Sequence, residues 1–148
     1  MTEQAEQNTA LAHRWFEEVW NQNNPDTIRE LVAPDCVAHG TSETGGDLRG
    51  PDGFLELQSR LLNAFPDLHI EVQDVLAVGD KIAVRWTGRM HHLGDSLGLA
   101  PTGVEIKVNG MGLARIADGK LVEIWDSWDK LSMFQQIEAA AKAKAISA

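Results

Sequence analysis

A single carboxylate on an otherwise apolar strand face is the feature of this sequence best suited to chemistry. The segment Leu121 to Asp129 alternates in the manner of a strand with one buried face. Its residues of one parity are Val122, Ile124, Asp126 and Trp128. Burial disfavours the charged form of a carboxylate and raises its pKa, which makes it a stronger base toward a proton on carbon. Asp126 is therefore a candidate general base, and hydrogen bonding to an indole or to the backbone is the structural alternative.

Two histidines could assist Asp126 as proton donors or as groups that stabilise a developing oxyanion. His39 follows a short apolar segment, and His92 shares strand parity with Trp86 if no bulge intervenes. A purely structural role is the alternative for each. The histidines show none of the spacings that bind a metal, so we expect no metal site.

The neighbouring strands predict which side chains surround the carboxylate. Counting across the turn at Asp118-Gly119 places Asp126 opposite Gly112, which leaves space for a ligand. Tryptophans of the inward parity could flank a flat ligand. The expected substrate-binding residues are Trp15, Trp86, Val108, Gly112, Ile124 and Trp128.

Three helices are expected before the strands. The apolar residues from Leu11 to Trp20 recur at helical spacing. Asn24 before Pro25 predicts the start of a short second helix that ends at Ala33-Pro34. A third helix begins at Pro51-Asp52 and ends before Pro66.

Alternating residues then predict four strands and a closing helix. The strands are His69 to Val78, Lys81 to Met90, Val104 to Ile116 and Leu121 to Asp129. The glycine-punctuated but apolar loop Leu93 to Gly103 is expected to act as a flap over the pocket. Asp129 is expected to cap the last helix, which carries Leu131, Met133, Phe134 and Ile137.

Helices followed by long antiparallel strands predict an α+β fold. We expect a cone-shaped, curved, mostly antiparallel sheet wrapped around the N-terminal helices, with the wide end as a small-molecule cavity. The chain is expected to be one domain, residues 1–148, with frayed ends at about 1–8 and 139–148. Strand parity predicts that Met111, Leu121 and Trp125 face outward, where they would suit a sheet-to-sheet dimer interface.

Composition excludes several functional classes. The net charge of −9, with no basic patch, disfavours nucleic acid and anionic membrane surfaces as partners. No apolar run approaches the roughly 18 residues of a membrane helix, and the start of the chain lacks a signal peptide. Cys36 is the single cysteine, so a cytoplasmic location is expected. Neither a phosphate-binding glycine-rich loop nor Gly-x-Ser-x-Gly is present.

Several short motifs, in order and spacing, resemble the SnoaL-like polyketide cyclase family from about Ala10 to Ile137. These motifs are Trp20-Asn21, Ala64-Phe65-Pro66-Asp67, Arg85-Trp86-Thr87, Pro101-Thr102-Gly103, Asp118-Gly119-Lys120 with Glu123, and Trp125-Asp126. The resemblance implies the nuclear-transport-factor-like cone, also described as a cystatin-like α+β barrel. It also implies a homodimer or tetramer formed through the outer face of the sheet, and no metal or organic cofactor.

The resemblance further implies an enzyme that acts on a hydrophobic, carbonyl-rich small molecule. In the characterised cyclases an aspartate on the closing strand is the general acid/base of an intramolecular aldol condensation, and Asp126 matches its position. A histidine on the preceding strand assists there, but Gly112 occupies that position here. Epoxide hydrolase or ketosteroid isomerase chemistry on the same fold is one alternative, although Asn109 has the wrong parity to orient water. Ligand binding without catalysis is the other.

Overall fold

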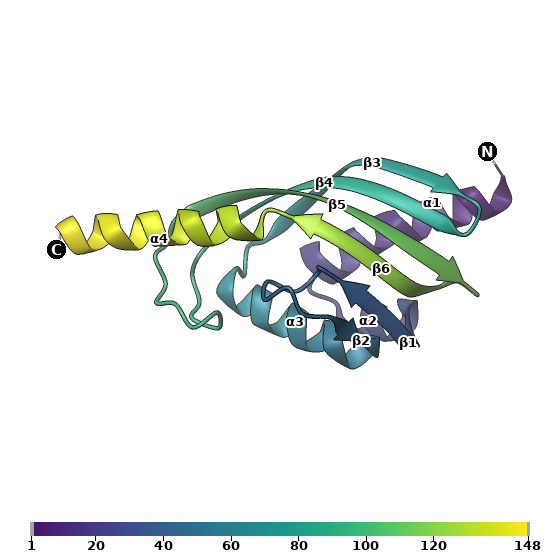
Figure 1. The fold of residues 1–148 in the computed structure, drawn as a ribbon, viewed down its shortest axis with the longest axis horizontal. Coiled ribbons are helices and arrows are strands. Elements are labelled where there is room, and N and C mark those ends of the chain that lie inside the picture. The colour runs from purple at the N-terminus through teal and green to yellow at the C-terminus, as the bar shows by residue number, and fades with distance from the viewer. Residues whose placement is uncertain (1, 148) are drawn as a thin grey trace.

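The computed structural model describes residues 2–147 as a curved sheet with the N-terminal helices packed on one side, while the C-terminal helix projects beyond the end of the sheet (Figure 1). The helices are α1 (Glu3–Arg14), a π-helical continuation η1 (Trp15–Asn21), α2 (Pro25–Leu31), α3 (Gly50–Ala64) and α4 (Lys130–Ser147). The strands are β1 (Val32–His39), β2 (Leu48–Arg49), β3 (His69–Val78), β4 (Lys81–His91), β5 (Glu105–Ala117) and β6 (Lys120–Trp128). This α+β architecture confirms the predicted fold class.

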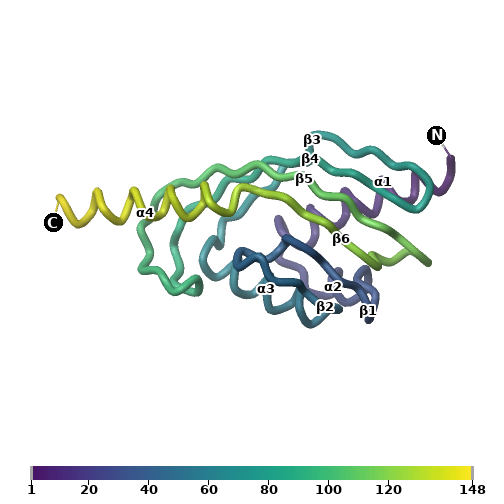
Figure 2. The backbone as a smooth tube through the Cα atoms, in the orientation of Figure 1, coloured from purple at the N-terminus to yellow at the C-terminus, as the bar shows by residue number. Residues whose placement is uncertain are grey.

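The six strands form one open, mixed sheet in the order β2-β1-β6-β5-β4-β3. All neighbours are antiparallel except β1 and β6, which run parallel. The tube trace shows β3 to β6 curving over α1, with α2 and α3 beneath β1 and β6 (Figure 2). Apolar side chains from these helices and from the concave face of the sheet make up the core.

Helices α2 and α3 begin where the local sequence predicts. The Asn24 side chain accepts a hydrogen bond from the backbone N–H of Asp26, and Pro25 occupies the first turn of α2. Pro51 lies in the first turn of α3. Helix α1 begins at Glu3 and helix α4 continues to Ser147. Helical structure therefore covers most of the two ends that were expected to fray.

The four long strands are confirmed to within one residue at each end. The segment Val32–His39 was not predicted as a strand, yet it forms β1, which includes Ala33-Pro34 and lies between β2 and β6. Its pairing with β6 is broken between Val32 and Val37, so Pro34 sits where no regular ladder is needed.

The register of the β5–β6 hairpin confirms the central prediction, because Gly112 lies opposite Asp126. The expected outward orientation of Leu121 is wrong. A register shift between Arg115 and Ile116 reverses the parity of β6 before Ile124, and Leu121 is buried at 3% exposure. Trp125 and Met111 are on the outer face, 39% and 58% exposed.

Two further expectations fail for local reasons. The loop from Leu93 to Gly103 packs against the end of α3, where Gly94 N–H donates to the Ala64 carbonyl at 3.1 Å and Ser96 Oγ donates to the Arg60 carbonyl at 2.5 Å. None of its residues lines the apolar cavity that contains Asp126. The Asp129 side chain accepts from the backbone N–H of Asn109 at 2.7 Å, so it holds β5 rather than capping α4.

Candidate active site

An apolar cavity of about 100 Å³ lies between the concave face of the sheet and helices α1, η1 and α3. Pockets that enclose drug-sized ligands measure roughly 300–1,000 Å³. A ligand of several rings must therefore extend beyond this space or displace side chains. Four tryptophans line the cavity, Trp15, Trp20, Trp86 and Trp128. Its polar side-chain groups are Asp126, the hydroxyl of Thr41 and the indole N–H groups.

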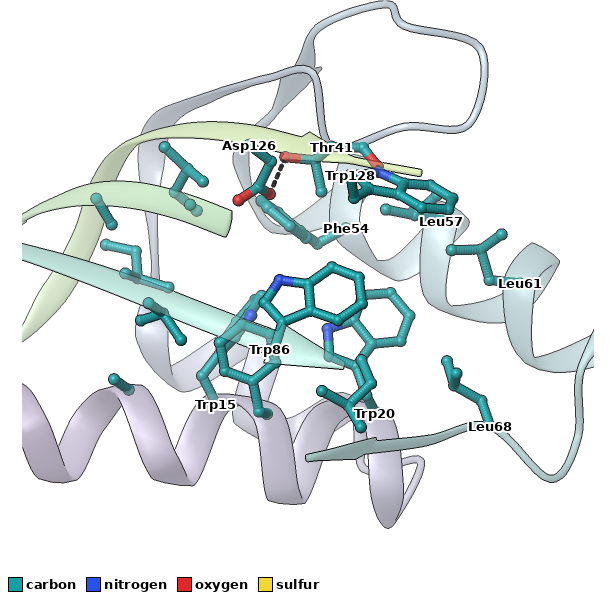
Figure 3. Close-up of a pocket in the computed structure, with 18 of the residues that line it drawn as sticks. Trp15, Trp20, Thr41, Phe54, Leu57, Leu61, Leu68, Trp86, Asp126 and Trp128 are labelled. Atoms are coloured by element: carbon teal, nitrogen blue, oxygen red, sulfur yellow. Dashed lines mark hydrogen bonds between the residues drawn. The ribbon is translucent and has the colours of Figure 1, made fainter. Parts of the chain in front are cut away.

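Asp126 projects from β6 into this cavity (Figure 3). A Cβ atom on Gly112 would come within 2.2 Å of Asp126 Oδ1, so the carboxylate occupies the space that a side chain on β5 would need. Desolvation by burial raises the pKa of Asp126 to about 6, against the opposing effects of the Thr41 hydrogen bond and the positive charge of Lys130. Its pKa therefore lies near that of an effective base at neutral pH.

Thr41 holds the carboxylate in place. Its hydroxyl donates to Asp126 Oδ2 at 2.6 Å, and its own carbonyl accepts from Trp128 Nε1 at 2.9 Å. Gly40, at φ +76°, brings this loop close to β6, because a Cβ there would lie 2.2 Å from the Asp126 carbonyl oxygen. The β1–β6 pairing and the hydrogen bond from Trp128 thus hold Thr41 in place, so that its hydroxyl donates to one oxygen of Asp126.

The loop that carries Thr41 is anchored to α3 by a partly buried ion pair between Glu43, which is buried, and Arg60, which is partly exposed. Arg60 donates from Nε to Glu43 Oε2 at 2.6 Å and from Nη2 to Oε1 at 2.7 Å, and Ser42 Oγ donates to Oε1 at 2.9 Å. Hydrogen bonding to Arg60 lowers the pKa of Glu43, which keeps the carboxylate charged. Sequence reasoning missed both Thr41 and this anchor.

The residues predicted to bind substrate come together around the cavity. The lining includes Trp15, Trp86, Val108, Gly112, Ile124 and Trp128, with Asp126 among them. Trp15 contributes from η1 and packs edge-on against Phe54 of α3 at 5.1 Å between ring centroids. Trp15, Trp20 and Trp86 lie across the cavity from Asp126 and Thr41 (Figure 3).

His39 does not line the cavity. Its ring stacks on the outward-facing Trp125 at 5.9 Å, with Nδ1 3.1 Å from Asp47 Oδ1 and Nε2 2.8 Å from Glu123 Oε2. The hydrogen bond with Glu123 raises the pKa of His39, and the bond with Asp47 adds to this effect. These contacts place His39 on the outer side of β1 and β6, away from Asp126.

His92 does not line the cavity either. It is fully buried and packs against Phe65, whose ring centroid lies 5.8 Å away. The Nδ1 atom accepts from the backbone N–H of Thr102 at 3.3 Å, whereas Nε2 has no hydrogen-bond partner within residues 2–147. Burial lowers the pKa of His92, so the ring is held neutral.

Other candidate chemistries find little support in the described chain. Among residues 2–147, no group of three or more His, Cys, Asp or Glu side chains could hold a metal ion. Burial raises the pKa of the Cys36 thiol to about 11, which disfavours a thiolate nucleophile. No helix within the same range is long and apolar enough to cross a membrane.

Comparison with known proteins gives consistent matches over most of the chain. The model of the family described as SnoaL-like polyketide cyclase matches residues 10–137. Aklanonic acid methyl ester cyclase DnrD of Streptomyces peucetius is 26% identical over 121 residues, 81% of this chain and 83% of that protein.

Solved structures agree with these sequence matches. IdmH of Streptomyces antibioticus, described as a candidate polyketide cyclase, has a TM-score of 0.75 and 31% identity over 88% of this chain and 97% of its own. A candidate SnoaL-like polyketide cyclase from Jannaschia sp. CCS1 has a TM-score of 0.84 and 25% identity over 94% and 96% of the two chains.

Proposed function

This chain belongs to the SnoaL-like polyketide cyclase family, and from that premise we propose that it closes a ring in a hydrophobic, carbonyl-rich molecule by an intramolecular aldol reaction. Asp126 is the general base. The observation that carries this proposal is the single carboxylate in an apolar cavity, with its pKa raised to about 6 by burial. A carboxylate of ordinary pKa would be a weaker base toward carbon.

The reaction needs only proton transfer and one new carbon–carbon bond. Asp126 takes a proton from the carbon between two carbonyl groups, and the electron pair of the broken C–H bond passes into an enolate. The enolate carbon attacks a ketone carbon of the same molecule, and the protonated Asp126 returns its proton to the resulting alkoxide. No atom is gained or lost, so the product is an isomer of the substrate and no redox cofactor is required.

The cavity supplies the folding of the substrate that this reaction needs. Holding the enolate carbon against its acceptor keeps a flexible chain in a reactive geometry that it would seldom adopt in water, and this lowers the barrier. The indole faces of Trp86 and Trp128 suit a flat, conjugated chain.

The state of Asp126 favours catalysis over simple ligand binding. Within residues 2–147, its Oδ2 atom accepts one side-chain hydrogen bond, from Thr41, and Oδ1 accepts none. A carboxylate saturated by hydrogen bonds from the protein would instead favour the binding alternative. Epoxide hydrolysis is less well supported, because Asp126 is the one carboxylate among the described lining residues and Asn109 is exposed on the outer face.

Turnover of a polyketide ester tests the proposed function. DnrD is named for aklanonic acid methyl ester, so that ester is the first substrate to incubate with the purified protein. We expect a product of unchanged mass and altered retention on chromatography. If neither this ester nor simpler 1,3-diketone esters that contain a ketone acceptor are cyclised above the uncatalysed rate, the proposed function is wrong.

Removing the Thr41 hydroxyl should shift the pH dependence of the reaction. The hydrogen bond from Thr41 opposes the rise in the pKa of Asp126, so Thr41→Val should raise that pKa further above about 6. The base must be ionised, and we therefore expect the rising limb of kcat/KM to move to higher pH by about one unit. Thr41→Ser, which keeps the hydroxyl, is the matched control. An unmoved limb in Thr41→Val would show that this bond does not tune the base.

A further inference from the structure

Two successive positions on the concave face of β5 are glycines, and side chains from the neighbouring strands fill the space above both. Above Gly112 lies the carboxylate of Asp126 from β6. Above Gly110 lies the indole of Trp86 from β4, because a Cβ on Gly110 would come within 2.2 Å of Cζ2, 2.3 Å of Cε2 and 2.8 Å of Nε1. A polar edge of the indole and the carboxylate thus converge over the same strand.

The indole N–H of Trp86 is available to a ligand. Among residues 2–147, Trp128 is the tryptophan whose indole makes a hydrogen bond, to the Thr41 carbonyl. The Trp86 Nε1 atom has no such bond, and the protein does not enclose it completely. Trp86 lines the cavity, and its ring faces Asp126 across that space (Figure 3).

We propose that the Trp86 Nε1–H donates a hydrogen bond to the substrate oxygen that becomes the enolate when Asp126 removes the proton. This assignment rests on the proposed function and supplies the oxyanion-stabilising group that neither His39 nor His92 provides. Indole donates only and does not titrate in the accessible range, so its protonation state is fixed at every working pH.

The spacing of Gly110 and Gly112 fits these two roles, with Asp126 as the base and Trp86 as the hydrogen-bond donor. Strand residues two apart lie about 7 Å from each other at a rise of about 3.4 Å per residue. A carbonyl group and its α-carbon, with a contact of about 3 Å at each end, span a similar length. The proton-bearing carbon would then lie against Asp126 while the carbonyl oxygen lies against Trp86. A donor fixed on a strand and surrounded by apolar side chains stabilises developing charge more than one in water does.

Binding of a phenolate tests the donor without requiring turnover. Asp126→Asn places an amide where the protonated acid stands after proton abstraction, and 4-nitrophenol is a flat, coloured mimic of the enolate when ionised. We would titrate the absorbance of 4-nitrophenol bound to Asp126→Asn, and to the same variant carrying Trp86→Phe or Trp20→Phe. Trp20 is the matched control, since it also contributes an indole to the cavity lining.

We expect Trp86→Phe to weaken phenolate binding about tenfold relative to binding of the neutral phenol, which raises the pKa of bound 4-nitrophenol by about one unit. Trp20→Phe should keep the preference for phenolate. An unchanged preference in Trp86→Phe, or an equal loss in Trp20→Phe, would overturn the proposal.

Should Trp86→Phe fail to fold, the indole N–H resonances of Asp126→Asn give the same answer. The Trp86 signal should move downfield on addition of 4-nitrophenolate by more than the Trp20 signal, and a stationary Trp86 signal would refute the donor. These readouts are independent of cyclisation. A protein that binds phenolate through Trp86 but cyclises no ester would contradict the proposed function, and would show only that Trp86 donates to a bound oxyanion.

Discussion

Replacing Asp126 with asparagine should lower kcat for ester cyclisation by about 10²–10⁴-fold, the usual contribution of a positioned general base. The amide keeps the size of the carboxyl group and can still accept from Thr41, so the change removes basicity and leaves the cavity in place. KM should change little, because the contacts with the apolar walls remain. Steady-state kinetics measured by chromatography of the isomeric product gives both constants.

Asp74→Asn is the matched control for that loss. Asp74 lies on β3, is 59% exposed and pairs with Arg85, so its charge is remote from the cavity and an exposed pair contributes little to stability. Asp74→Asn should turn over the ester at the native rate. Retained activity in Asp126→Asn would contradict the assignment of Asp126 as the base, whatever the control does.

Asp126→Asn should also stabilise the folded protein at neutral and alkaline pH. The pKa of Asp126 is about 6 in the folded chain, against an ordinary value of 3.8. A group whose pKa is raised by folding contributes stability below its unfolded pKa and loses it as the pH rises through the folded pKa. The full loss is about 3 kcal/mol for about two pKa units, of which about 2 kcal/mol falls between pH 4 and pH 8.

Urea unfolding at pH 4 and pH 8 measures this difference on either side of the isoelectric point of about 4.9. Asparagine does not ionise, so the stability of Asp126→Asn minus that of the native protein should grow by about 2 kcal/mol between the two pH values. Asp74→Asn should show no such growth. A pH-independent difference in stability for Asp126→Asn would mean that folding does not raise the pKa of Asp126.

Local patterns predicted the long strands well because one face of each strand is apolar and the other is polar. Alternation and a turn at Asp118-Gly119 sufficed to place Asp126 opposite Gly112. Strand β1 escaped prediction because Pro34 suggested a break, whereas the irregular pairing between Val32 and Val37 accommodates a residue without an N–H. The parity of Leu121 failed because one residue of bulge reverses a strand face, and nothing local marks that bulge.

The site was predicted only in part because its partners are distant in sequence. Apolar residues around Asp126 follow from strand parity, but Thr41 reaches it across the parallel β1–β6 pair, whose register joins His39 to Trp125. Given that pairing, a hydroxyl two residues beyond His39 would have been an obvious neighbour of Asp126. The positions of His39 and His92 depend on Glu123, Phe65 and other contacts that alternation does not encode.

Gly112 and Asp126 cannot be substituted independently of each other. A side chain at the position of Gly112 collides with the Asp126 carboxylate as it now lies, 2.2 Å from the first added atom. A side chain introduced there would move the carboxylate and disturb its hydrogen bond with Thr41. The two positions are therefore epistatic, because the effect of a substitution at one depends on the residue at the other.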